Sequence, residues 1–117
     1  MQLALALWNQ ERREAACDEM RRASQLAPKD ADIRNYLGVA LLQLGRIPEA
    51  IDQFHEAVRL NPNNAAAAHA NLGLALLASG KLRQSIPEFE AALRLKPELK
   101  GAADNLPRAQ AQLGSQR

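Results

Sequence analysis

Apolar residues along this chain recur every three or four positions, which is the spacing of one face of an α-helix. Between residues 36 and 62 they follow a set order, in which a leucine–glycine pair precedes a second glycine, a phenylalanine, an alanine and a proline. The same order returns 35 positions later, where Gly38, Phe54 and Pro62 are matched by Gly73, Phe89 and Pro97. An interval held in this way predicts stacked helical repeats and outweighs any single motif.

A partial copy of the pattern stands on either side of these two. The matches fall 34 positions away, with Met20 and Pro28 before Phe54 and Pro62, and with Leu106 and Gly114 after Leu72 and Gly80. We therefore expect helix hairpins over about residues 1–30, 31–65 and 66–99, and a capping helix over about 101–114. The first hairpin lacks its opening residues, which suggests that the chain is part of a longer protein.

Small and helix-breaking residues explain why such a hairpin forms. Gly38 and Gly73 allow the two helices of a hairpin to cross closely, and a phenylalanine fills the space between repeats. Gly45 and Gly80 are expected to end the first helices, because a positive φ costs glycine little. A proline then stops each second helix, since it has no N–H to donate.

Three places depart from the regular pattern. The first hairpin is expected to hold one helix over residues 1–8 and another over 13–27, which makes seven helices in all. Pro87 lies inside a second helix, which should either begin late, near Ser85, or kink there. Pro107 replaces a glycine in the capping helix, whose apolar side should cover the core of the preceding hairpin.

This pattern resembles the tetratricopeptide repeat, a helix–turn–helix unit of about 34 residues. The resemblance covers nearly all of residues 1–117, and the two middle copies carry it best. It implies a single all-α domain, a right-handed superhelix of antiparallel helix hairpins (an α-solenoid) of about three repeats and a C-terminal capping helix. It also implies a module that binds other proteins in its concave groove without catalysis of its own.

Composition agrees with a helical module. Of the 117 residues, 47% are hydrophobic and only 3% aromatic, which suits close helix packing better than a β-sandwich. The 15 basic and 13 acidic residues leave a net charge of +2, so no strongly basic surface for nucleic acid is expected. The single cysteine excludes an internal disulfide and gives no metal cluster.

The apolar stretch at the N-terminus predicts a helix of the first repeat. Residues 3–7 lack the basic flank of a signal peptide, and the apolar run ends at Asn9. No run approaches the about 18 apolar residues of a membrane span. These features do not fix the cellular compartment, although they favour the cytosol.

No set of residues predicts a catalytic or metal site. His55 and His69 stand 14 positions apart, which is not the spacing of metal ligands on one helix. His69 is expected to be half-buried, His55 exposed, and Cys17 a buried thiol. We therefore expect no enzyme activity, no metal and no cofactor.

By the geometry that the resemblance implies, the first helix of each hairpin lines the groove. The candidate residues for binding a partner there are Leu5, Trp8, Tyr36, Val39, Leu42, Asn71, Leu74, Leu77, Asn105 and Arg108. Some related modules hold a C-terminal carboxylate with an asparagine at the level of Leu5, Val39, Leu74 or Arg108, and its absence argues against that clamp. Asn71 and Asn105 instead resemble the inward asparagines of O-linked N-acetylglucosamine transferases, whose amides hold peptide backbone.

The expected partner is a protein or peptide, bound in the groove as an extended or an amphipathic segment. The apolar pairs on successive first helices favour an amphipathic one. Two other classes stay open: a repeat module that associates with itself through its groove or its ends, and a helical repeat that binds single-stranded RNA. The mainly Leu, Val and Ala character of the inward positions argues against RNA.

Overall fold

The computed structural model describes the backbone of residues 2–116 and the side chains of residues 8–116. That part of the chain forms six α-helices and one 3-10 helix. Their bounds are α1 Gln2–Leu26, α2 Ala31–Gln43, α3 Ile47–Leu60, η1 Pro62–Asn64, α4 Ala66–Ala78, α5 Leu82–Leu95 and α6 Lys100–Ser115. The described residues contain no helix long and apolar enough to cross a bilayer.

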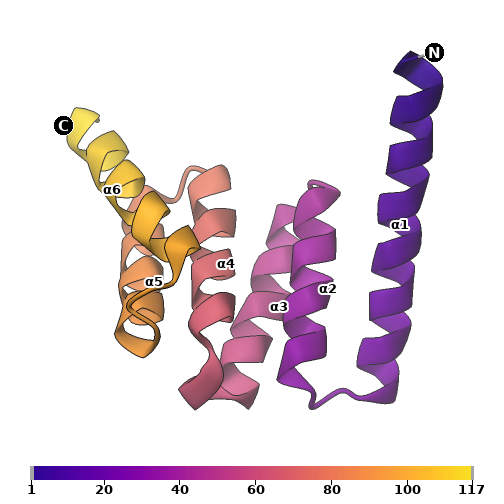
Figure 1. The fold of residues 1–117 in the computed structure, drawn as a ribbon, viewed down its shortest axis with the longest axis horizontal. Helices are drawn as coiled ribbons and strands as arrows, with labels where there is room; N and C mark the ends of the chain where they lie inside the picture. Colours follow the sequence, from indigo (N-terminus) through magenta and orange to yellow (C-terminus); the bar gives the residue numbers. More distant parts are fainter. Residues whose placement is uncertain (1, 117) are drawn as a thin grey trace.

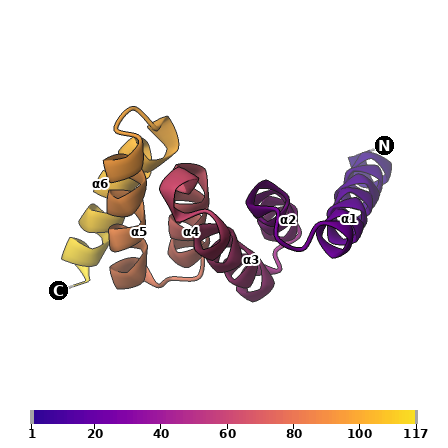
Figure 2. The same ribbon diagram turned by 90° about the horizontal axis from the view of Figure 1, so that it is seen from below.

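The helices stack side by side in chain order (Figures 1 and 2). Helices α2 and α3 form one hairpin, α4 and α5 form the next, and each hairpin packs on the one beside it. Helix α1 stands at one end of the row, and α6 covers α5 at the other. This arrangement is the expected all-α solenoid with a C-terminal capping helix.

The expected seven helices are wrong, because α1 is one continuous helix of 25 residues. The turns after α2 and α4 are made by Gly45 and Gly80, whose φ values are 78° and 79°. The position 34 residues before Gly45 is Glu11, and no glycine or proline occurs between residues 9 and 27. The helix therefore continues where a turn was expected, and its N-terminal half extends past the end of α2 (Figure 1).

The close crossings inside the two hairpins are confirmed. A Cβ atom added to Gly38 would lie 2.7 Å from Cδ1 of Phe54, and one added to Gly73 would lie 2.6 Å from Cε1 of Phe89. Both phenylalanine rings are fully buried. Hydrogen is thus the only side chain that fits between the first helix and the ring of the second.

The hydrophobic core consists of clusters that link neighbouring helices. One cluster joins Cys17 of α1 to Leu41 of α2, Phe54 of α3 and Leu76 of α4. Another joins Phe89 of α5 to α4 and α6, and on α6 its buried members are Ala102 and Ala109, with Leu106 packed beside them. Cys17 is 1% exposed, which confirms the buried thiol.

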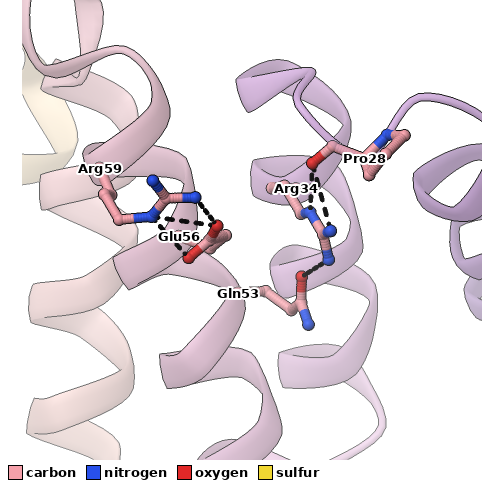
Figure 3. Close-up of polar contacts among 5 residues, drawn as sticks. All are labelled: Pro28, Arg34, Gln53, Glu56 and Arg59. Carbon is pink, nitrogen blue, oxygen red and sulfur yellow. Dashed lines mark hydrogen bonds and ion pairs between the residues drawn. The ribbon is translucent and has the colours of Figure 1, made fainter.

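Arg34 ties three elements together through its guanidinium group (Figure 3). Its Nε and Nη2 donate to the backbone oxygen of Pro28 at 3.3 and 3.2 Å, and Nη1 donates to Oε1 of Gln53 at 3.1 Å. One side chain of α2 therefore holds the turn that follows α1 and the middle of α3. The neighbouring pair of Arg59 and Glu56 lies within α3 alone, and its hydrogen bonds lower the pKa of the Glu56 carboxyl.

Helix α5 passes through Pro87 without beginning late. It starts at Leu82, and the hydroxyl of the buried Ser85 donates to the Leu82 oxygen at 2.7 Å. Helix α6 likewise runs through Pro107, which lies on its exposed side. Both prolines are exposed, so neither displaces core side chains, although each loses one backbone hydrogen bond and crowds the carbonyl four residues before it.

A candidate peptide-binding surface

The first helices of successive hairpins lie next to one another. Contacts join α2 to α4 and α4 to α6, although each pair is separated in sequence by a second helix. A hydrogen bond marks the first of these junctions, in which Nδ2 of Asn71 donates to Oδ1 of Asn35 at 3.0 Å. The surface of α2, α4 and α6 is therefore continuous, and we call it the first-helix face.

Tyr36 is the large side chain that this face presents to solvent. It follows Asn35 on α2, and 58% of its surface is exposed. A phenol ring in this position offers an apolar plane and a hydroxyl group to a ligand, and aromatic residues are enriched where proteins bind proteins. Tyr36 and the paired amides of Asn35 and Asn71 thus form the centre of the candidate surface.

The apolar residues predicted for the groove are half-buried and belong partly to the core. Val39 and Leu42 pack against the cluster around Phe54, while Leu74 and Leu77 pack against the cluster around Phe89. Much of their surface is therefore used in holding neighbouring helices together. The apolar stripe open to a partner is narrower than the sequence suggests.

Two polar residues predicted to bind a partner, Asn105 and Arg108, lie on α6. The side chain of Asn105 donates from Nδ2 to the backbone oxygen of Gly101 at 2.7 Å, which holds its amide against its own helix. Arg108 is exposed. Of the two asparagines compared with a peptide-holding ladder, Asn71 therefore pairs across helices and Asn105 does not.

Trp8 does not join this face. It is 52% exposed, and the guanidinium carbon of Arg12 lies 4.6 Å from its ring centroid. Trp8 stands nine positions before the buried Cys17, which is about two and a half helical turns and so the opposite side of α1. The side chain of Leu5, the other candidate on α1, lies outside the described residues.

The sequence reasoning missed Asn35. Tyr36 was matched to Asn71 by the repeat interval, and the amide that meets Asn71 is one position earlier. The interval between α2 and α4 is 35 residues, so Tyr36 and Asn71 are equivalent positions, but equivalent positions of neighbouring repeats need not be the ones that touch. The polar character of Asn35 on a first helix was the available signal.

The histidines behave as expected. His69 is half-buried, and its Nδ1 lies 2.9 Å from Oε1 of Glu88 on α5, while His55 is exposed on α3. In the described part of the chain, no three His, Cys, Asp or Glu side chains come together as metal ligands would. One surface hollow of about 380 Å³ lies between α1 and the C-terminal end of α2, and Asn9, Arg12, Arg13, Ala16 and Gln43 line it.

The fold and this surface define a helical-repeat module that presents a continuous face of first helices. Sequence profiles described as tetratricopeptide repeat match residues 1–65 and 66–99. The chain belongs to the tetratricopeptide repeat family. A comparison with curated protein sequences gives no significant match.

Solved structures show the same fold. The first tetratricopeptide domain of Spaghetti (RPAP3), bound to an HSP90 peptide, superposes with a TM-score of 0.84 at 21% identity, over 97% of this chain and 91% of that one. The first such domain of human RPAP3 gives 0.85 at 22% identity, over 97% and 89%. An O-GlcNAc transferase mutant of Thermobaculum terrenum gives 0.77 at 31% identity, over 83% of this chain but 18% of the enzyme.

Proposed function

We propose that this protein is an interaction module that binds a peptide segment of another protein on the first-helix face. The observation that carries the proposal is the hydrogen-bonded pair of Asn35 and Asn71 beside the exposed ring of Tyr36. Together they span the junction of α2 and α4. The proposal involves no catalysis and no cofactor.

Side-chain amides suit the backbone of an extended peptide. Asn71 uses Nδ2 and Asn35 uses Oδ1 in their mutual bond. The opposite atoms, Oδ1 of Asn71 and Nδ2 of Asn35, can accept from a peptide N–H and donate to a peptide C=O. Because these contacts read the backbone, they bind many sequences, and Tyr36 would supply the apolar anchor.

An extended segment is favoured over an amphipathic helix. A helix laid on this face would need a broad apolar strip. Leu42 and Leu74, which would form it, already pack against core clusters. The exposed Arg108 on α6 adds a positive charge at one end, which favours an acidic residue in the ligand.

Related structures support this class of partner. The domain of Spaghetti (RPAP3) is bound to the HSP90 peptide SRMEEVD, and the second domain of human RPAP3 to the HSP70 peptide SGPTIEEVD. These ligands belong to those proteins. For this chain they support peptide binding in general, while the missing clamp asparagine argues for a different peptide sequence.

The test is selection of linear peptides from a phage-displayed library, followed by fluorescence anisotropy with the selected peptide. Tyr36→Ala and Asn71→Ala should each weaken binding about tenfold, which corresponds to about 1.4 kcal/mol. His55→Ala, on the exposed side of α3, is the control and should leave affinity unchanged. Circular dichroism must show that all three variants keep their helices.

Two results would reject the proposal. One is a library that yields no peptide binder. The other is a binder whose affinity falls with His55→Ala but not with Tyr36→Ala or Asn71→Ala, because the ligand would then lie on the second helices.

A further inference from the structure

The outer face of α1 carries two large apolar side chains that the fold leaves in solvent. Trp8 is 52% exposed and Leu26 is 87% exposed. They stand 18 positions apart, about five full turns, so they project from the same side of the helix about 27 Å from each other. Cys17 lies midway between them on the opposite side and is 1% exposed in the core, so this face points away from the protein.

The residues between them alternate in charge. Positions that follow at spacings of four and three form one stripe, which we call the outer stripe: Trp8, Arg12, Ala15, Glu19, Arg22 and Leu26. All six are exposed. Spacings of four and three place side chains along one side of a helix.

The outer stripe is complementary to itself when two copies run antiparallel. With a two-fold axis near Ala15, Arg12 lies within one residue's rise, about 1.5 Å, of the level of Glu19 of the partner subunit, and Trp8 lies level with Arg22 of the partner subunit. The first contact joins opposite charges, and the second places a guanidinium group on an indole ring. Two-fold symmetry makes each contact twice.

Ala15 fits the same arrangement. A methyl group at the axis allows helices to approach to about 8 Å, the short end of the range for packed helices. A parallel pair would instead place Arg12 on Arg12 and Glu19 on Glu19, which repel.

We propose that this protein forms an antiparallel homodimer through the outer stripe of α1. The continuous helix creates the interface, because a turn near Glu11 would separate Trp8 from the rest of the stripe. The contact is distinct from the first-helix face, since none of its residues lies on α2, α4 or α6. A dimer joined in this way presents two peptide-binding faces.

Sedimentation equilibrium over low to high micromolar concentration tests the proposal with the full chain. The unaltered protein should dimerise, and its Trp8 emission should shift to shorter wavelength as the dimer forms. Arg12→Glu and Glu19→Arg should each raise the dimer dissociation constant about tenfold or more, because like charges then meet twice. The double variant R12E/E19R should dimerise as the unaltered chain does.

A mixture of the two single variants gives the sharpest result. In a mixed dimer each Glu meets an Arg in both contacts, so the two variants should associate with each other and not with themselves. Arg83→Glu and Glu90→Arg make the same charge changes on exposed positions of α5 and should leave the dimer intact. The proposal is overturned by a monomer at every concentration, by a dimer that ignores the single substitutions, or by a double variant that stays monomeric.

Discussion

Glycine serves this protein in two physically different ways. At Gly45 and Gly80 there is open space around the missing side chain, and the requirement is a positive φ, which costs other residues about 1–2 kcal/mol. At Gly38 and Gly73 the backbone is ordinary helix, and the requirement is space for a buried phenylalanine ring. Gly45 and Gly80 therefore allow the chain to turn, whereas Gly38 and Gly73 allow two helices to pack closely.

Replacing Gly73 with valine should therefore lower the free energy of unfolding by about 3 kcal/mol, because the fully buried Phe89 ring has nowhere to move. Urea denaturation followed by circular dichroism measures the change. Gly101→Val, where nothing lies within 4 Å of an added Cβ, is the matched control and should change stability little. The double variant that also carries Phe89→Ala should lose less free energy of unfolding than the two single variants lose in total, because both changes affect one contact. Losses that simply add would contradict that contact.

At the scale of elements, the solenoid depends on contacts that cross from one helix pair to the next. Helix α1 is joined to α2 by the cluster around Cys17, and Arg21 donates to Glu49 of α3 at 2.9 Å. Arg34 adds the bonds to Pro28 and Gln53. Because residues 8–16 of α1 are all exposed, its attachment rests on its C-terminal half.

Arg34→Met should loosen that attachment. The substitution keeps the apolar stem but removes three hydrogen bonds, and we expect a loss of about 1–2 kcal/mol in the free energy of unfolding. Hydrogen exchange should quicken in the second half of α1 more than in α4 and α5. Arg59→Met removes an exposed guanidinium whose bonds stay within α3, and equal losses in the two variants would refute the bridging role of Arg34.

For the whole molecule, the two ends of the row differ. At the C-terminal end, Ala102 and Ala109 of α6 are fully buried against the cluster of Phe89 and Ala92. At the N-terminal end, α1 turns exposed Trp8 and Leu26 outward. A solenoid needs a cover at each end, and here α6 provides one, while for the other end we propose contact with a second copy through the outer stripe of α1.

Removing residues 101–117 should therefore expose the Phe89 cluster. The truncated protein is expected to bind the dye ANS, to unfold at lower urea concentration and to aggregate, because apolar surface left uncovered promotes association. Removing only residues 116 and 117 is the control. A protein truncated at 101 that keeps its unfolding midpoint and binds no ANS would show that α6 does not cover the core.

The sequence alone was sufficient for the class of fold and for the local roles of its small residues. Gly73 could be assigned to a close helix crossing because a tight crossing is a steric condition that repeats with the unit, whereas the ring that it meets there, that of Phe89, was known only from the structure. Likewise the turn at Gly80 could be predicted from local backbone geometry. The burial of Cys17 and the partial burial of His69 could be predicted from their positions on a helix face.

Only the tertiary structure showed that α1 is one continuous helix, and which of the predicted groove residues are exposed. Residues 9–13 form a turn only if packing the first segment back against the second lowers the free energy more than continuing the helix does. A local sequence pattern does not contain that difference. The burial of Leu42 and Leu74, and the meeting of Asn35 with Asn71, depend on the offset between neighbouring hairpins. That offset results from the packing of all the helices together, so it is a property of the assembled solenoid and not of any one repeat.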